Sequence, residues 1–440
     1  MKNVGWVDNL RFRASYGEVG NDRSVGYYGY MSLYSLSMKY GGVTAAYKSQ
    51  NEALDLQWEA EKSFSTALEG RLFDRMNFTV EYFDKVTHDL LFDVEKPTSQ
   101  GGISFSSVTA ATTANIGSVS NKGVELSVDV DIIKKRDFNW NFGVNATWMK
   151  NTILQLPPAT ITNYDGMQNA IRNGTKLYAE GYGMYDYNTY LFVGVDQMTG
   201  LALYQIDDEK YYILEENIKG KTWNDETQSF DEIDKSLVPD PYAVVINGHE
   251  YVTSTTYAKR DYTGDQSLPK VYGSFNTGIR WKNFTLSALF TYALGSKCID
   301  GAYQDLMSVG LSPHSYHVDV LKSWKSAPAG MTETSADRID PNGTPRIDGF
   351  WSSYSNATST RFFVSGNYLI VKNVNLSYSL PKRWVNSMGL NGITLSASVD
   401  NLWSFTAMKG LNPQQSLSGT ISGYTINTPR IGTFGVRVNF

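Results

Sequence analysis

A pair of histidines comes closest to a metal-binding pattern in this sequence. His314 and His317 are three positions apart, and Asp319 follows two positions later. Imidazole and carboxylate are ordinary zinc ligands, but a site needs three or four of them aimed at one point. The chain contains only 4 His, and no helical pattern surrounds this pair to orient it. We therefore expect incidental loop histidines, no metal site and no cofactor.

Carboxylates recur in two further patterns that resemble functional sites. Residues 261–265 and 340–343 are rich in oxygen-bearing side chains, but neither has EF-hand spacing, so we expect solvated turns. Glu125, Asp129 and Asp131 share one face of a strand, which indicates a hydrated surface rather than an acid/base pair. The sequence has no phosphate-binding glycine loop, nucleophile elbow or HExxH motif. These observations predict no catalytic residues and no enzymatic activity.

Composition excludes other classes of protein. The net charge of -5 argues against a nucleic-acid binder, which would normally present a basic face. The single cysteine, Cys298, has no internal disulfide partner. No run of about 18 apolar residues occurs, which excludes a transmembrane helix but leaves transmembrane strands open.

An alternation of apolar and polar residues dominates the chain. From Phe138 to Trp148 every even-numbered residue is apolar, and most odd-numbered residues are Asn or Thr. The same alternation recurs in 124–132, 284–292 and 393–399. A period of two is typical of a β-strand with one apolar face. It fits a soluble sandwich and a membrane barrel equally well.

Connection lengths separate these two architectures. Short links near 74–75, 134–137, 282–283 and 381–392 alternate with long polar stretches at 17–62, 91–118, 152–270, 295–367 and 404–429. Outer-membrane barrels have short periplasmic turns and long extracellular loops, whereas a sandwich has no reason to collect its long loops on one side. The pattern predicts strands at 10–17, 62–73, 75–90, 118–133, 137–151, 271–282, 283–294, 368–381, 391–403 and 430–440. Up to two more are expected within 152–270, where Tyr185, Tyr187, Leu191, Val193 and Val195 alternate.

The expected fold class is therefore all-β. We predict that residues 1–440 form the carboxy-terminal half of an antiparallel transmembrane β-barrel, about ten to twelve strands of a larger wall. Tryptophans near strand ends suit the two membrane interfaces, at Trp6, Trp148, Trp281, Trp384 and Trp403. The end of the chain alternates up to an aromatic residue, with Phe434 and Phe440 as its anchors, and resembles the recognition signal of the barrel-assembly machinery.

Aromatic residues in the long stretches are the candidates for solute binding. Flat rings beside polar side chains stack on sugar faces or hold peptide side chains. The alternative is that these rings pack the loops against one another. The candidate residues are Tyr28, Tyr185, Trp223, Tyr303, Trp324, Trp351 and Tyr354.

Several segments, in this order, resemble the SusC/RagA family of TonB-dependent outer-membrane transporters from the Bacteroidetes. They are 10–17 with Gly20-Asn21, 56–59, 81–91, 115–126, 194–196 with Thr199-Gly200, 366–374, 376–381, 400–402 and the closing Phe440. Two departures occur in loops. Asn51–Leu56 lacks the proline that usually follows the asparagine and the basic residue before the Trp-Glu pair, and Leu411-Asn412-Pro413 lacks acidic residues common at that loop.

The resemblance implies location, partners and activity. It implies a cell outer-membrane protein, embedded in outer-membrane lipid, that imports oligosaccharides or oligopeptides under a SusD-like surface lipoprotein. It also implies energy from the TonB complex, which acts on an amino-terminal plug that this chain lacks together with the signal peptide. Nucleic acid is not an expected partner.

Two other classes of protein remain open from the residues alone. A passive outer-membrane porin or adhesin-like barrel would share the wall but have no energy coupling. A secreted glycan-binding or glycan-cleaving β-protein would bury its apolar face under a second sheet, and for cleavage would need paired acids at a cleft.

Overall fold

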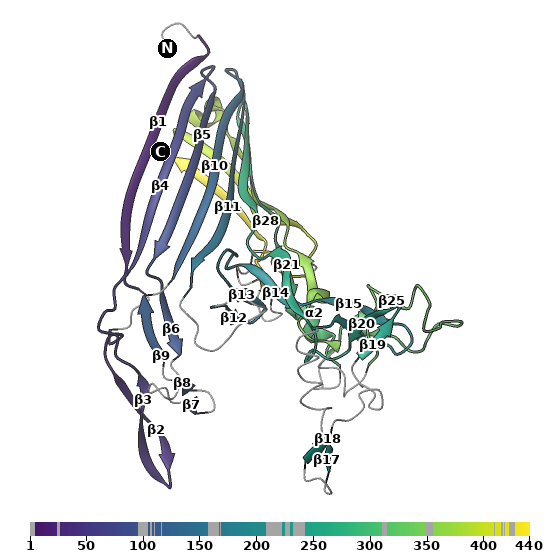
Figure 1. Ribbon diagram of the computed structural model, residues 1–440. Helices are drawn as coiled ribbons and strands as arrows, with labels where there is room; N and C mark the ends of the chain where they lie inside the picture. The colour runs from purple at the N-terminus through teal and green to yellow at the C-terminus, as the bar shows by residue number, and fades with distance from the viewer. Residues whose placement is uncertain are drawn as a thin grey trace.

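A single large sheet forms the main body of the molecule (Figure 1). The computed structural model describes residues 5–23, 27–95, 104–105, 108–109, 111–115, 117–156, 167, 169–207, 222–224, 229–231, 243–309, 315–347, 355–408, 410–414, 417, 419–421 and 427–440. The sheet has 10 strands in sequence order, and every neighbouring pair is antiparallel. They are β1 (Val7–Asn21), β4 (Glu59–Leu72), β5 (Met76–His88), β10 (Ser118–Lys134), β11 (Phe138–Gln155), β22 (Val271–Trp281), β23 (Phe284–Leu294), β27 (Tyr368–Ser379), β28 (Gly392–Thr406) and β30 (Ile431–Asn439).

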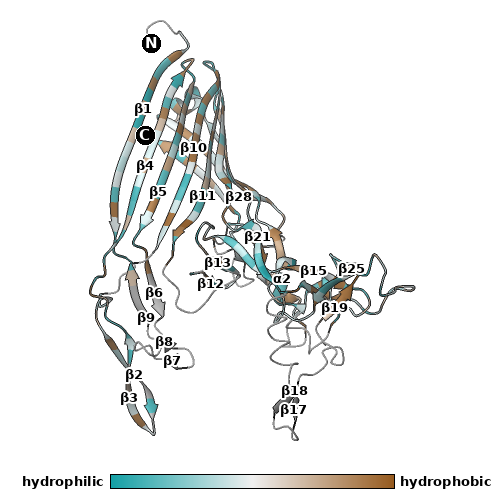
Figure 2. Ribbon diagram, viewed as in Figure 1, coloured by the Kyte–Doolittle hydropathy of each residue, from teal (hydrophilic) through white to brown (hydrophobic). Residues whose placement is uncertain are grey.

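All the strands predicted outside 152–270 are confirmed as members of this sheet, which we call the wall. Its register matches residues of like polarity across neighbouring strands. On β10 and β11, Leu126 lies opposite Ala146, and the next pair, Ser127 and Asn145, is polar. A one-residue slip would turn every apolar side chain to the wrong face, so the alternation itself fixes the pairing. Figure 2 shows hydrophobic and hydrophilic residues alternating along these strands.

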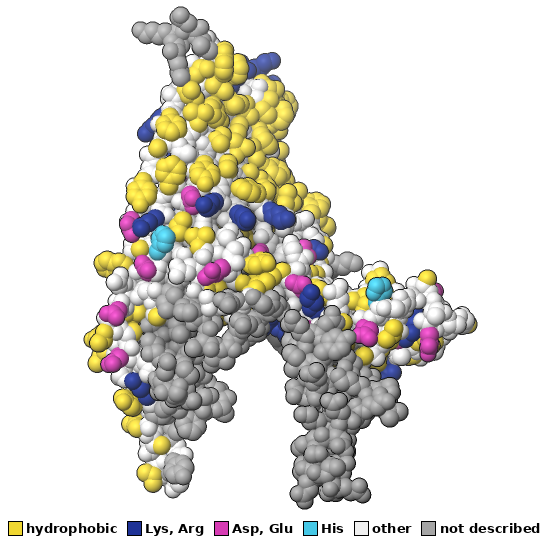
Figure 3. Space-filling view, viewed as in Figure 1, with side chains coloured by type: hydrophobic (Ala, Val, Ile, Leu, Met, Phe, Trp, Pro, Cys, Tyr) yellow, Lys and Arg dark blue, Asp and Glu magenta, His cyan; other side chains and the backbone are white. Residues whose placement is uncertain are grey.

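The apolar face of the wall is uncovered. Phe12 and Phe434, at opposite edges of the sheet, are each 72% exposed, and Phe440 is 90% exposed. Figure 3 shows the hydrophobic side chains merging into a broad band over the strands, with charged side chains gathered where the band ends toward the loops. A soluble sandwich would bury such a face under a second sheet. An uncovered band on a β-wall is instead the surface that meets lipid.

The tryptophans predicted for the membrane interfaces lie at the edges of this band. Trp6, Trp281 and Trp384 are close to the short turns, and Trp148 and Trp403 are nearer the loops. All of them are between 50% and 55% exposed. Half-exposed indole rings at both ends of the strands fit an amphipathic interface rather than a packed interior.

The short turns are all at one end of the wall, and the long loops are all at the other (Figure 1). Phe73 and Asp74 link β4 to β5 with φ values of 56° and 54°, the left-handed backbone of a tight hairpin. The link between β27 and β28 contains a short helix, α4 (Lys382–Ser387). This arrangement confirms the strict alternation of short and long connections.

The prediction of further wall strands within 152–270 is wrong. The alternating residues there form β14 (Asp186–Tyr190) and β15 (Phe192–Asp196), which belong to two small sheets among the loops. Strands of five residues are too short, because a membrane strand needs about 9–11 residues. Tyr187 and Val195 are both 0% exposed, so their alternation reflects burial between loops and not contact with lipid.

The loops carry their own small elements. One sheet contains β2 (Leu33–Tyr40), β3 (Val43–Gln50), β9 (Ala111–Asn115) and β6 (Leu91–Glu95), and a pair contains β7 (Ser104–Phe105) and β8 (Val108–Thr109). The loop between β11 and β22 supplies β12 (Ile171–Asn173), β13 (Lys176–Tyr178), β16 (Ala202–Gln205), β17 (Thr222–Asn224), β18 (Ser229–Asp231), β19 (Ala243–Ile246), β20 (His249–Val252) and β21 (Arg260–Gln266). Later loops supply β24 (Lys297–Asp300), α2 (Gly301–Leu306), η3 (Val318–Lys322), β25 (Ile339–Asp340), η4 (Thr360–Phe362), β26 (Phe363–Ser365) and β29 (Thr420–Ile421). Among the described residues, no helix is long and apolar enough to cross a membrane.

Gly123 is needed for a reason other than a strained backbone. Its φ lies outside the left-handed region, but a Cβ there would come within 2.5 Å of the Phe83 ring on the neighbouring strand. Phe83 is 8% exposed and covers the glycine on the polar side of the wall. The glycine therefore makes room for an aromatic ring across the strand pair.

Candidate solute-binding site

A cavity of about 510 Å³ lies where three of the long loops meet. The loop that follows β11 contributes most of its lining, and two residues come from each of the loops that follow β23 and β28. The lining mixes aromatic, thioether, amide and hydroxyl side chains with one lysine. The residues are Asn173, Gly174, Thr175, Lys176, Tyr178, Met184, Tyr185, Gln304, Thr358, Leu417 and Thr420.

Lys176, the first residue of β13, is the unusual member of this lining because it is only 7% exposed. Its Nζ donates to Ser267 Oγ at 2.6 Å and to the Leu417 carbonyl at 3.3 Å. The rings of Tyr185 and Tyr187 flank it, with centroids 5.0 and 5.6 Å from Nζ. All of these partners are neutral, so hydrogen bonds and ring faces hold a buried ammonium without an ion pair to any described carboxylate.

The electrostatics of the pocket follow from burial. Burial lowers the pKa of Lys176 to about 8, although the Asp186 carboxylate opposes the shift. Burial also raises the pKa of Asp186, which accepts a hydrogen bond from the Gly183 N–H at 2.8 Å and faces that turn. The pKa of the Cys298 thiol is raised to about 11 by burial, so it stays protonated beside the lysine. Burial therefore makes the charge of Lys176 easier to lose near neutral pH than the charge of an exposed lysine.

Tyr187 connects the same loops beneath the cavity. It is fully buried, and its hydroxyl lies 2.8 Å from the Gly419 carbonyl and 3.0 Å from the Lys297 carbonyl. Gly419 has a φ of +84°, and any side chain there would collide with the Tyr187 hydroxyl. These contacts join the loops after β11, β23 and β28 into one packed unit, which fixes the shape of the cavity.

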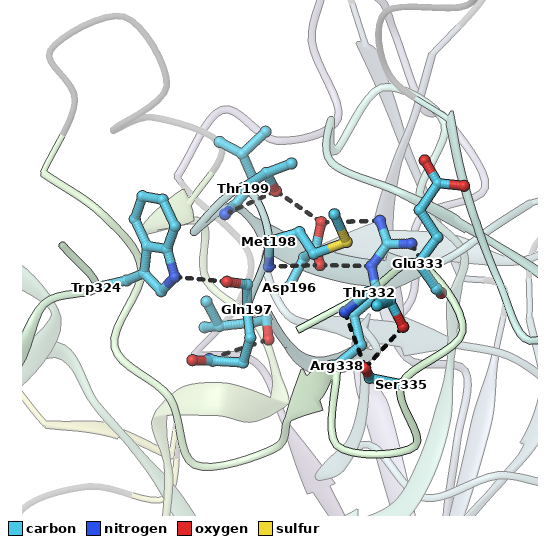
Figure 4. A network of polar contacts seen from close by, with 11 residues as sticks. Asp196, Gln197, Met198, Thr199, Trp324, Thr332, Glu333, Ser335 and Arg338 are labelled. Atoms are coloured by element: carbon cyan, nitrogen blue, oxygen red, sulfur yellow. Dashed lines mark hydrogen bonds and ion pairs between the residues drawn. The ribbon is translucent and has the colours of Figure 1, made fainter. Parts of the chain in front are cut away.

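A second network stabilises the neighbouring loop sheet (Figure 4). Asp196, at the end of β15, is 0% exposed and lies opposite Arg338, which is 6% exposed. Asp196 also accepts hydrogen bonds from the Thr199 hydroxyl at 2.8 Å and the Met198 N–H at 3.1 Å. Burial acts to raise the pKa of Asp196, but the hydrogen bonds from Arg338, Thr199 and Met198 together hold this pKa below its usual value. This network closes a turn and is architectural rather than catalytic.

The predicted solute-binding aromatics are in different environments. Tyr185 lines the cavity, and Tyr28 is 63% exposed in the first long loop. Tyr303 packs against Phe362 and points its hydroxyl to Asp319, 3.3 Å away. Trp324 covers Gly200 and donates to the Gln197 carbonyl at 2.8 Å (Figure 4). Trp223 lies in β17, paired with Phe230, whereas Trp351 and Tyr354 fall outside the described residues.

His317 has a structural role in its loop. Its Nδ1 accepts the Asp319 N–H at 3.1 Å and so caps the 3-10 helix η3. His314 falls outside the described residues. Within the described ranges, no group of three or more His, Cys, Asp or Glu side chains lies close enough to hold a metal ion.

Sequence patterns did not point to Lys176. It follows Asn173-Gly174-Thr175 in a turn-rich stretch that has no distinguishing pattern. Its partners Ser267 and Leu417 are 91 and 241 positions away, so only the folded loops bring them together. The sequence did mark Asp196 as a residue of interest, because it lies in one of the segments that resemble SusC/RagA proteins.

Comparisons with known proteins agree with this architecture. Residues 3–402 match the model of the family described as TonB dependent receptor-like, beta-barrel. TonB-dependent receptor P39 of Formosa agariphila is 27% identical over 433 residues, which are 94% of this chain and 38% of that protein. TonB-dependent receptor SusC of Bacteroides thetaiotaomicron is 24% identical, over 99% of this chain and 38% of its own length.

A solved structure has the same fold over the whole chain. The RagAB peptide transporter superposes with a TM-score of 0.72 at 22% identity, covering 100% of this chain and 42% of that one. The chain thus spans about two-fifths of the length of these relatives, at 38% and 42%. The chain belongs to the TonB-dependent receptor-like β-barrel family of outer-membrane transporters and is similar within it to SusC and to the RagAB transporter.

Proposed function

We propose that the protein is a SusC-like importer that carries oligosaccharides or oligopeptides inward across the outer membrane. The observation that carries this proposal is the cavity at the convergence of three loops, in a molecule whose wall has an exposed apolar face. Tyr178 and Tyr185 offer ring faces, while Asn173, Gln304 and Thr358 offer hydrogen-bonding groups. A few convergent polar groups among aromatic walls are the usual composition of a site for an organic solute.

The proposal includes partners and an energy source. The RagAB peptide importer has been solved in 'closed-closed' and 'open-open' states. By analogy, we propose that a SusD-like lipoprotein closes over the loops of this chain, and that TonB drives release of the solute through a plug. The terminal alternation that ends at Phe440 is proposed to direct folding by the barrel-assembly machinery, since its apolar residues Phe434, Val436, Val438 and Phe440 are exposed.

Uptake in a strain that lacks the gene tests the proposal. Cells are given labelled oligosaccharides and labelled oligopeptides of matched mass, and internal label is measured with and without the gene. We expect uptake of one of the two classes to depend on the gene. Unchanged uptake of both classes would reject the import function.

A further inference from the structure

The buried ammonium of Lys176 forms no direct ion pair with a carboxylate among the described residues. Lysine is almost never fully buried unless it is paired, because desolvation penalises its charge. Here two of its three N–H groups meet a hydroxyl and a carbonyl, and the third has no acceptor among the described residues. Asp186, the nearby acid, accepts the Gly183 N–H and acts on Lys176 only through space, without a hydrogen bond to it. The loops therefore bury a lysine whose ammonium has no carboxylate in direct contact.

Space for a counter-ion lies beside this cation. Tyr185, whose ring centroid is 5.0 Å from Nζ, and Leu417, whose carbonyl is 3.3 Å from it, both line the cavity of about 510 Å³. We propose that Lys176 binds a carboxylate of the transported solute in this cavity, a proposal that rests on the import function above. The solute is then an acidic oligomer, either a peptide with a free carboxylate or a sugar chain containing uronic acid.

The surroundings favour a carboxylate over a phosphate. A single lysine provides one positive charge, which matches the single charge of a carboxylate, and charge-assisted N–H···O bonds to it are about 2.7–2.9 Å long. A phosphate group carries a charge near -2 and three acceptor oxygens. The rest of the lining is uncharged and consists of Tyr178, Tyr185, Met184, Leu417, Gly174 and neutral polar side chains. Such a lining suits the organic part of a carboxylic acid.

Amine labelling measures the proposed contact directly. Outer membranes that contain the protein are treated at pH 7 with an uncharged acylating reagent, and mass spectrometry follows the Lys176 peptide with acetate or with acetamide present. A carboxylate partner raises a lysine pKa by at least about one unit, so acetate should slow labelling of Lys176 roughly tenfold. Acetamide should leave it unchanged. Lys259, paired with Asp261 at 3.1 Å on the surface, is the matched control.

Two results overturn the proposal. One is equal labelling of Lys176 in acetate and acetamide. The other is that Lys176 is not labelled even when acetate is absent, which would mean that the amine is not accessible from the cavity. Two further pairs of compounds distinguish the sources of the carboxylate by their effect on labelling of Lys176. If the solute is a peptide, N-acetyl-trialanine should slow the labelling and its amide should not. If the solute is a uronic acid chain, a galacturonate trimer should slow the labelling and a galactose trimer should not.

Transport by variants keeps this proposal separate from the import function. Lys176→Met should lose uptake of the acidic oligomer at least tenfold, and Lys176→Arg should retain most of it. If Lys176→Met still imports acidic oligomers at the native rate while import remains TonB-dependent, the carboxylate contact is rejected and the importer stands. If neither native protein nor variant imports any oligomer while acetate still protects Lys176, the import function fails instead.

Discussion

Arg338 and Asp196, 142 positions apart, form a two-point ion pair inside the loop region. Nε donates to Oδ1 at 2.8 Å and Nη2 to Oδ2 at 3.2 Å. Arg338→Ala should destabilise the loop sheet by roughly 3–5 kcal/mol, because it leaves a buried carboxylate unpaired. Hydrogen exchange of β15 and β25 measures the loss. The exposed pair of Lys259 and Asp261 is the control, and Lys259→Ala should cost only about 0–1 kcal/mol. Equal effects would show that burial of the Asp196 pair is unimportant.

The same pair predicts a dependence on pH. The pKa of Asp196 is lower in the folded loops than its usual value. Because the pKa of Asp196 is lower in the folded than in the unfolded protein, its ionised form stabilises the fold at pH values above the unfolded pKa of about 4. This stability is lost as the pH falls through the pKa of the folded protein. Protection of β15 from hydrogen exchange should therefore be constant from neutral pH down to about 4 and fall below it. In Asp196→Asn this acid-induced step should be absent.

Charged substitutions on the outward face of the wall should destabilise the protein in the membrane. Leu126 faces outward and is 38% exposed, and Ser127 lies on the other face of the same strand. Leu126→Arg should cost roughly 2–4 kcal/mol near the bilayer midplane, whereas Ser127→Arg should be milder. Folding into liposomes across a urea series compares the two variants. Equal tolerance would mean that both faces meet water.

The strands of the wall were predictable because lipid and the polar interior impose opposite demands on alternate residues. Leu126 and Ser127 express these demands in the sequence itself. The loop strands were not predictable in their role, because neighbours bury both faces. In β14, the consecutive residues Tyr187, Asn188 and Thr189 are all at most 2% exposed. The cavity was even less accessible to prediction, since Lys176 acquires its environment from loops distant in the sequence.

Cysteine labelling tests the orientation of the wall. Asp74→Cys, Lys135→Cys and Asn283→Cys place thiols in the short turns, and Tyr28→Cys places one in an exposed loop. An impermeant thiol reagent on intact cells should label Tyr28→Cys and none of the turn variants. The native Cys298 is buried and provides the background. Labelling of all three turns in unbroken cells would reverse the topology.

The edges of the wall give a prediction for the isolated chain. In the described residues β1 pairs only with β4, and β30 pairs only with β28, so each has an unpaired edge. Open strand edges are not tolerated in lipid. Residues 1–440 behind an export signal should therefore aggregate or be degraded. A monomeric, heat-modifiable, conducting barrel from this chain alone would instead support the passive porin.

Energy coupling distinguishes the proposed importer from a passive pore most directly. The measurement is the rate of uptake of the imported oligomer in cells that carry the gene, before and after TonB is depleted. The account predicts that gene-dependent uptake falls to the level of the deletion strain when TonB is lost. Uptake that continues at the same rate without TonB, and that rises in proportion to external concentration, would contradict it.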